Sequence, residues 1–328
     1  MALLNVGQGA ARAGLWTLVS WALIAGIDAF WPGAQRSPPP AAPAAGTPPL
    51  AWVLRLYVPL QLGLMGVGLF AAAQGTAWEV ACLALAVGFV TGGQGITYAH
   101  ELGHSRHRGD RLLAWVLMTS VGYPQFMVEH YRGHHVRAAT RDDPASARRG
   151  ESLWRFLPRT LGGSFMGAWR LEAARLRQLK QGWLNSPLAW ATGGNAALVL
   201  ALAAWGQYAM LGFWLGQSAF AIWLLETVNY IEHYGLERQV SSSGQREPFG
   251  LMHAWNADHV ATNSVLANLQ RHSDHHMHAW KPFPALQALP GPQLPTGYAG
   301  CLMLAALPPL WFGLMHPRLD ALRAQGLG

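Results

Sequence analysis

The chain has 328 residues, of which 51% are hydrophobic and only 12% are charged. This charged fraction is about half that of typical soluble domains, so the composition excludes an ordinary soluble protein. The net charge of +7 is distributed unevenly, because many arginines follow residue 100. Only Cys82 and Cys301 occur, both among apolar neighbours, which excludes a disulfide framework and a thiolate metal site.

Apolar residues are grouped in long blocks. A helix needs about 20 apolar residues to cross a bilayer, and five blocks reach or approach this length with at most one charged residue each. These blocks are Gly14–Trp31, Leu54–Gln74, Ala77–Ala99, Ala191–Leu211 and Phe213–Ile231. The first is expected to be an uncleaved span rather than a secretory signal, because no clear cleavage site follows it and more spans come later. The pattern predicts an all-α integral membrane protein.

The connections between the blocks divide the chain further. Ser37 to Pro49 is rich in proline and alanine, which predicts a linker. Residues 112–127 and 298–315 are apolar but short or interrupted by proline, so they are expected to be amphipathic or interfacial helices. Glycines at 63, 66, 68, 88, 92, 93 and 95 are expected to let span helices approach closely.

The arginines predict the orientation of the spans. Ten arginines lie between residues 106 and 159, whereas the connection at 74–76 has no charge. The positive-inside rule therefore places 100–190 in the cytoplasm. We expect transmembrane helical hairpins topped by a histidine-rich cytoplasmic helical cap. The predicted divisions are a first helix and linker (1–50), a first hairpin (51–99), a cytoplasmic histidine region (100–190), a second hairpin (191–232) and a C-terminal cap (233–328), with five or six spans in all.

Nine of the 14 histidines lie in four short clusters. The clusters are H-E-L-G-H at 100–104, E-H-Y-R-G-H-H at 129–135, N-Y-I-E-H-Y-G at 229–235 and L-Q-R-H-S-D-H-H at 269–276. Spacings of three or four residues put imidazoles on one helical face. All four clusters fall on the same predicted side of the membrane, although the arginine argument did not use the histidines.

The first cluster matches H-E-x-x-H, the signature of zinc metalloproteases. The motif uses only two of the nine clustered histidines and leaves the other seven unused, although a catalytic zinc takes three protein ligands. Nine histidines are better suited to two first-row metals of higher coordination number. Imidazole binds iron, copper, nickel and zinc, so ligand type does not select the metal. Nitrogen-rich sites beside an apolar helical bundle favour redox chemistry.

The four clusters, with a weaker match of LPTGYAG at 294–300, resemble those of the integral-membrane alkane 1-monooxygenases. These are non-heme di-iron hydroxylases related to membrane fatty-acid desaturases and xylene monooxygenase. The similarity runs from about residue 54 to 318. Ser105, Tyr131 and Met277 depart from residues that are common in that family, but none of them is a ligand position.

The resemblance implies roles for many residues. The nine iron ligands would be His100, His104, His130, His134, His135, His233, His272, His275 and His276. Groups that orient the metal-bound rings would be Glu101, Glu129, Asn229, Glu232, Asp274, Glu226 and His253, with His259 resembling part of the same segment as His253. Glu226 is also a candidate because intramembrane carboxylates are commonly functional. His107, His278 and His316 are expected at the surface or interface.

The implied reaction is O₂-dependent terminal hydroxylation of n-alkanes at two non-heme irons in the bacterial inner membrane. The same chemistry on alkyl side chains of aromatics, or on fatty-acyl chains, is the nearest alternative; a zinc protease and a non-enzymatic metal-handling membrane protein are remote ones. The chain has no flavin, nicotinamide or iron–sulfur fingerprint, so electrons must come from a separate carrier. The resemblance names rubredoxin with an NAD(P)H-dependent reductase. Membrane lipids are expected partners and nucleic acid is not.

Overall fold

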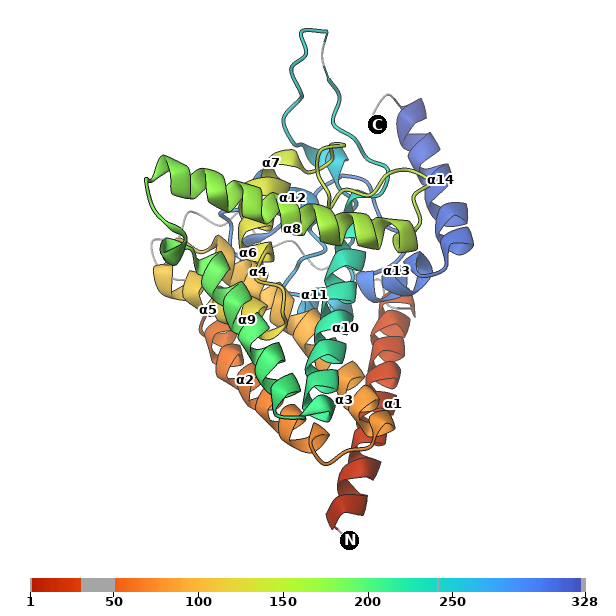
Figure 1. Ribbon diagram of the computed structural model, residues 1–328. Helices are drawn as coiled ribbons and strands as arrows, with labels where there is room; N and C mark the ends of the chain where they lie inside the picture. The colour runs from red at the N-terminus through yellow and green to blue at the C-terminus, as the bar shows by residue number, and fades with distance from the viewer. Residues whose placement is uncertain (1, 31–50, 241, 326–328) are drawn as a thin grey trace. The chain divides into compact units, whose positions relative to one another are not determined.

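The computed structural model describes residues 2–30, 51–240 and 242–325 (Figure 1). Within these residues the regular structure is helical apart from two isolated β-bridges, Val240–Arg246 and Asn256–Gln293. The predicted all-α class is therefore confirmed. The proline- and alanine-rich linker lies outside the described residues.

The chain divides into two compact units. Unit 1 comprises Met1–Trp21, Pro49–Val128 and Ala168–Leu225, and unit 2 comprises Ala22–Pro48, Glu129–Gly167 and Glu226–Gly328. Four helices have residues in both units: α1 (Ala2–Phe30), α6 (Phe126–Glu129), α8 (Leu153–Gln178) and α10 (Tyr208–His233).

The remaining helices belong to one unit each. Unit 1 contains α2 (Ala51–Ala72), α3 (Ala77–Val90), the π-helical turn η1 (Thr91–Gly95), α4 (Ile96–His104), α5 (Arg108–Ser120), η3 (Trp183–Asn185) and α9 (Pro187–Ala204). Unit 2 contains the π-helical turn η2 (His130–His134), α7 (His135–Arg137), η4 (Leu251–His253), α11 (Val260–Val265), α12 (His272–Met277), η5 (Phe283–Ala285), α13 (Tyr298–Ala305) and α14 (Pro308–Ala324).

Five described helices are long and apolar enough to cross a membrane. They are Gly9–Phe30, Ala51–Ala72, Ala77–His104, Pro187–Ala204 and Tyr208–His233, and the pair α13–α14, bent by 118°, is a sixth candidate if it counts as one broken span. The chain is a multi-pass membrane protein, as the apolar blocks predict.

Local signals explain the differences from the predicted span boundaries. The fourth span is shifted toward the N-terminus because the Ser186 side chain caps α9, Pro187 occupies its first turn, and Gly206 ends it at a φ of +67°. The third span begins at a capping box between Thr76 and Glu79. A hydropathy profile measures the length of an apolar block and does not detect these capping residues.

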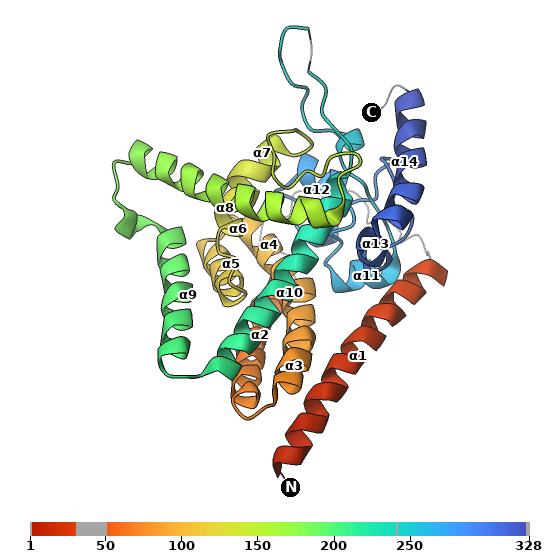
Figure 2. The ribbon, with the colours of Figure 1, turned by 45° about the vertical axis from the view of Figure 1, so that its right-hand side comes forward.

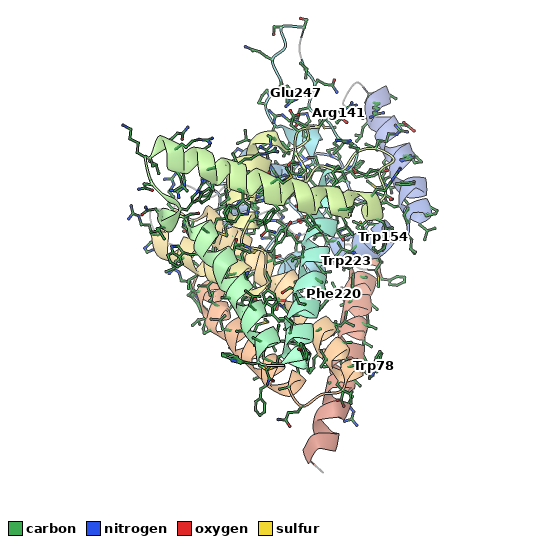
Figure 3. All side chains as sticks on the ribbon, in the orientation of Figure 1. Trp78, Arg141, Trp154, Phe220, Trp223 and Glu247 are labelled. Carbon is green, nitrogen blue, oxygen red and sulfur yellow. The ribbon has the colours of Figure 1, made fainter. Side chains whose placement is uncertain are left out.

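Close helix packing forms the core of unit 1. An added Cβ at Gly88 would lie 2.8 Å from the Gln217 carbonyl oxygen, and one at Gly92 would lie 2.7 Å from Ala221 Cα. These two glycines therefore permit a close approach to α10, in line with the predicted close packing of span helices. The prediction is wrong for Gly63, Gly66 and Gly93, where an added Cβ meets nothing within 4 Å. On α10, Phe220 and Trp223 stack with ring centroids 5.6 Å apart (Figure 3).

In unit 1, α2 and α5 run in the same direction. Near their first turns, Arg55 donates to Asp110 at 2.7 Å, and farther along Gln61 donates to Ser120 Oγ at 2.8 Å. Both helices thus begin at the end of unit 1 where α4 finishes at His104, and α5 turns back from there along α2.

Aromatic side chains form the core of unit 2 beside the end of α10. Tyr230 packs against Phe156 and Trp311, with centroids 5.4 and 5.7 Å away. The buried Trp255 indole donates to the Tyr234 carbonyl at 2.8 Å. These contacts hold the segment around His253 against the end of the last span.

Candidate metal centre

Unit 2 contains a group of four histidines from three segments. Their nearest ring nitrogens all lie within 4.8 Å of one another, and the members are His134, His233, His272 and His276. The Nε2 atoms of His233 and His272 are 3.2 Å apart. The rings therefore converge on one small volume.

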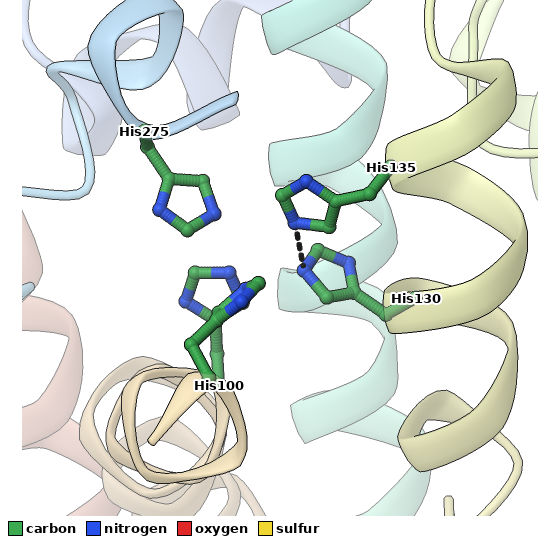
Figure 4. A group of neighbouring side chains, drawn as sticks. His100, His130, His135 and His275 are labelled. Atoms are coloured by element: carbon green, nitrogen blue, oxygen red, sulfur yellow. Dashed lines mark hydrogen bonds between the residues drawn. The ribbon is translucent and has the colours of Figure 1, made fainter. Parts of the chain in front are cut away.

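The second group within unit 2 contains His130, His135 and His275, whose ring nitrogens also lie within 4.8 Å of one another. The Nε2 atoms of His130 and His135 are 3.0 Å apart, and Figure 4 shows both rings turned toward His275. In unit 1, His100 and His104 lie one turn apart on α4, with ring centroids 4.8 Å apart.

A π-helical turn explains how the second histidine cluster is divided between the two groups. In a π-helix residues five apart are hydrogen-bonded neighbours, so η2 brings His130 and His135 together while His134 joins the other group. The fourth cluster is divided similarly on α12, where His272 and His276 belong to one group and His275 to the other. The expected spacings of three and four residues therefore account for only part of the arrangement.

The four-histidine group fits a metal ion. His134 Nε2 and both ring nitrogens of His276 are buried and have no hydrogen-bond partner within the described residues. Leaving such nitrogens buried and unpaired is costly, and a metal ion would satisfy them. Burial lowers the pKa of His276 well below the ordinary value, and neighbouring histidines lower it further. The same holds for the pKa of His135 of the second group. Both rings are therefore neutral, as metal ligation requires.

Hydrogen bonds orient two of these rings. His134 Nδ1 lies 2.9 Å from Asp143 Oδ2, and His233 Nδ1 lies 3.2 Å from the His253 carbonyl oxygen. The Glu232 carboxylate lies 3.1 Å from His272 Nδ1. The two hydrogen bonds fix the ring tautomers and would leave Nε2 free to hold a metal ion.

Asp143 is a site residue that the sequence analysis did not select. It is fully buried and also accepts a hydrogen bond from Ser146 Oγ at 2.6 Å. Burial alone would raise the pKa of Asp143, but the His134 ring and these hydrogen bonds hold it below the ordinary value. The sequence feature that could have indicated Asp143 is its position eight residues after His135, in R-D-D-P.

Several predicted supporting residues have other immediate partners. Glu129 pairs with Arg137, and its pKa is raised to about 7 because burial outweighs the effect of the arginine. Asp274 accepts from Lys281 at 2.7 Å and lies 2.7 Å from His278 Nδ1. Glu226 accepts from Thr160 at 2.7 Å and from Asn229 at 3.2 Å.

Glu232 has a second partner besides His272. The buried Tyr298 hydroxyl, from the 294–300 segment, donates to Glu232 Oε1 at 2.8 Å. The His253 ring lies 3.0 Å from Glu247, while its carbonyl oxygen is the group that meets His233. Glu101 is half-buried on α4.

Comparisons with known proteins show the family of the chain. A model of the fatty acid desaturase family matches residues 76–316. The chain is 42% identical over 272 residues to alkane 1-monooxygenase 1 of Pseudomonas aeruginosa, covering 80% of this chain and 71% of the relative. It is 39% identical over 250 residues to alkane 1-monooxygenase of Pseudomonas putida, covering 75% and 62%.

A third relative is the hydroxylase component of the xylene/toluene monooxygenase of Pseudomonas putida, 30% identical over 275 residues, with 80% of this chain and 72% of the relative covered. The family model matches most of the chain, and the chain is 42% identical to an alkane 1-monooxygenase over 71% of that relative, so this chain belongs to the membrane fatty acid desaturase family, in the group that contains the alkane 1-monooxygenases.

Proposed function

We propose that this protein catalyses the O₂-dependent terminal hydroxylation of n-alkanes to primary alcohols at a nine-histidine di-iron site. The observation that carries the proposal is the pair of histidine groups in unit 2, in a chain 42% identical to an alkane 1-monooxygenase. The multi-pass architecture suits a substrate that dissolves in lipid. We place the protein in the bacterial inner membrane with its site on the cytoplasmic side, on the basis of the arginines that follow residue 100.

The proposed ligands divide into two sets. His134, His233, His272 and His276 would hold one iron. His130, His135 and His275 would hold the other together with His100 and His104, which offer two imidazoles on one face of α4. Two irons suit this many nitrogen ligands better than a zinc with three. Iron, when bound, supplies the activation of O₂ and the redox chemistry.

The protein's own residues orient the ligand rings and exclude water. Asp143 and the His253 carbonyl hold the His134 and His233 rings in the tautomer that leaves Nε2 available, and Glu232 lies beside the His272 ring. Tyr298 holds Glu232 in place. The buried surroundings of the histidines exclude water from the reacting groups. An alkane has no hydrogen-bonding group, so its orientation must come from the shape of an apolar passage.

Electrons are proposed to come from rubredoxin, itself reduced by an NAD(P)H-dependent reductase. The sequence has only two cysteines, too few for the four thiolates of an iron–sulfur or rubredoxin centre. Exposed arginines such as Arg141, whose side chain is 78% exposed, offer a docking face for an acidic carrier.

Hydroxylation of alkyl side chains of aromatics is the second candidate, because of the xylene/toluene monooxygenase component among the relatives. The lower identity to this protein, 30% against 42%, favours alkanes. Oxidation of fatty-acyl chains uses the same type of site and is a further alternative.

Product analysis tests the proposal. The purified protein is supplied with iron, rubredoxin, its reductase, NADH and a mixture of a medium alkane, a long alkane and p-xylene. Primary alkanols are expected by gas chromatography–mass spectrometry; benzylic alcohol alone would transfer the chain to the aromatic group. His134→Ala and His275→Ala, one from each group, are expected to abolish turnover, whereas the exposed His107→Ala retains it.

Metal analysis of the same preparation tests the site separately. About two irons per chain are expected. A single zinc without iron would contradict the di-iron site and return the H-E-x-x-H motif to the protease interpretation.

A further inference from the structure

Unit 1 contains an open groove of about 790 Å³ that the histidine centre does not use. It is bounded by α2, α5, α9 and the first half of α10, and Figure 2 shows α9 standing apart from α10 along this side. Its surface is almost entirely apolar, from side chains such as Leu62, Leu112, Trp115 and Leu198. A groove of this size is within the usual range for a small-molecule site.

Regular stripes on two helices line the groove. On α5 the stripe runs Arg108, Arg111, Leu112, Trp115, Val116, Thr119 and Ser120, and on α9 it runs Pro187, Trp190, Ala191, Gly194, Asn195 and Leu198. This spacing marks one face of each helix. α5 and α9 also touch each other, since Trp115 packs against the cluster that contains Leu188, and the stripe residues of both helices border the open groove.

The two charged residues of the groove lie at one end. Arg108 and Arg111 are in the first turn of α5, at the end of unit 1 where the third span finishes at His104. Arg108 is exposed, and its side chain makes no hydrogen bond within the described residues; Arg111 is half-buried and donates to the Ser105 and Arg106 carbonyl oxygens. A guanidinium group just beyond the end of a span lies at the level of lipid headgroups.

The depth of the groove matches one leaflet. Leu62 is about 11 residues from the start of α2, and Leu198 and Thr119 are the same distance from Pro187 and Arg108. At about 1.5 Å per residue this is about 16 Å, half of a hydrocarbon core of about 30 Å. The groove therefore extends from the interface to about the middle of the bilayer.

From these observations we propose that the groove binds one anionic phospholipid from the leaflet on the histidine side. Its phosphate pairs with Arg108 and Arg111, and an acyl chain lies along the α5 and α9 stripes. A hydrocarbon would fill the apolar part but leave both guanidinium groups without a counter-charge. The charge at the interface end is therefore the observation that selects a lipid with a negative headgroup. The proposal does not depend on the reaction of the histidine centre.

Lipid binding is measured by native mass spectrometry of the delipidated full-length protein, titrated with phosphatidylglycerol or with phosphatidylcholine of the same chains. The wild type is expected to bind the first phosphatidylglycerol about 30-fold more tightly, from two basic groups near the surface. The double variant Arg108→Gln, Arg111→Gln is expected to lose this preference. The control Arg170→Gln, Arg177→Gln removes two exposed arginines of α8 and keeps it.

Two leucine variants of α9 test whether an acyl chain of the lipid lies in the groove. An added Cβ meets nothing within 4 Å at either Gly193 or Gly194, but only Gly194 lines the groove. Gly194→Leu is expected to weaken binding of both lipids at least tenfold, whereas Gly193→Leu leaves it unchanged. Arg108→Gln alone is also measured, because Arg111 contacts the backbone.

Three results would overturn the proposal. The first is that the wild type binds phosphatidylglycerol and phosphatidylcholine with equal affinity. The second is that the α8 control loses the preference for phosphatidylglycerol as much as the Arg108, Arg111 double variant does. The third is that Gly193→Leu and Gly194→Leu bind lipid equally. Iron content and a monodisperse elution profile check folding of each variant. Neither readout requires turnover, so failure of the proposed alkane hydroxylation leaves this test intact.

Discussion

At the residue scale, the contact between His134 and Asp143 connects the metal centre to the surrounding protein. Both side chains are almost wholly inaccessible, and Asp143 accepts hydrogen bonds from His134 Nδ1–H and from the Ser146 hydroxyl. Loss of such a contact commonly lowers metal affinity or activity about 10–100-fold.

We therefore expect Asp143→Asn to lower iron affinity about 10–100-fold, because the amide cannot hold His134 as the carboxylate does. The neighbouring Asp142 is a matched control, since its exposed carboxylate pairs with Arg246 at 3.3 Å. Asp142→Asn is expected to retain the iron of the wild type. Iron per chain, measured by elemental analysis across a chelator titration, distinguishes the two; equal iron loss in both would assign Asp143 no special role.

At the element scale, the packing of the third span on α10 depends on glycine. Gly92→Ala puts a Cβ 2.7 Å from Ala221 Cα, so the backbones must separate. We expect a destabilisation of about 1–3 kcal/mol. Gly93→Ala, one residue away, meets open space and is expected to be neutral or to stabilise by up to about 1 kcal/mol. Thermal unfolding in nanodiscs measures both, and equal melting temperatures would show that the approach is not tight.

The ion pair between α2 and α5 gives a prediction about pH. Burial by itself would raise the pKa of Asp110, but hydrogen bonds from Arg55 and Ser105 hold it below the ordinary value. The pKa of Asp110 is lower in the folded protein than in the unfolded chain, where it is about 3.9. The ion pair with Arg55 therefore stabilises the fold above about pH 3.9, and this stabilisation is lost as pH falls through the folded pKa.

Asp110→Asn is expected to destabilise the protein at pH 7 by about 1–3 kcal/mol, the usual contribution of a hydrogen bond to a charged group. The deficit should shrink on acidification below about pH 4, where the wild type also loses the charge. Melting temperatures between pH 3.5 and 7 measure this. Asp320→Asn, in an exposed pair with Arg149, serves as the control; a deficit that did not change with pH would contradict the assignment to the charge.

At the scale of the whole molecule, the uneven distribution of arginine predicts how the protein meets its electron donor. If an acidic rubredoxin docks on exposed arginines, raising the salt concentration from about 0.05 to 0.5 M shortens the Debye length and should lower the rate several-fold at limiting rubredoxin. Reduction by dithionite provides the control, because it needs no docking surface. A rate with rubredoxin that is independent of salt would count against this interface.

The sequence by itself determined the class of the protein and predicted which histidines are the proposed metal ligands. Apolar blocks of span length are sufficient for a helical membrane protein, because backbone groups in lipid must be satisfied within the helix. Histidines three or four residues apart lie on one face of an α-helix, so their clustering is visible in the chain.

Tertiary structure decided how the unit 2 histidines divide into groups and which groups orient them. The π-helical turn pairs His130 with His135, and α12 contributes to both groups. Asp143 and the His253 carbonyl are recognised only by their distances to His134 and His233. The groove likewise follows from the separation of α9 from α10 (Figure 2). Such arrangements depend on packing between segments distant in sequence, and local periodicity carries no information about that packing.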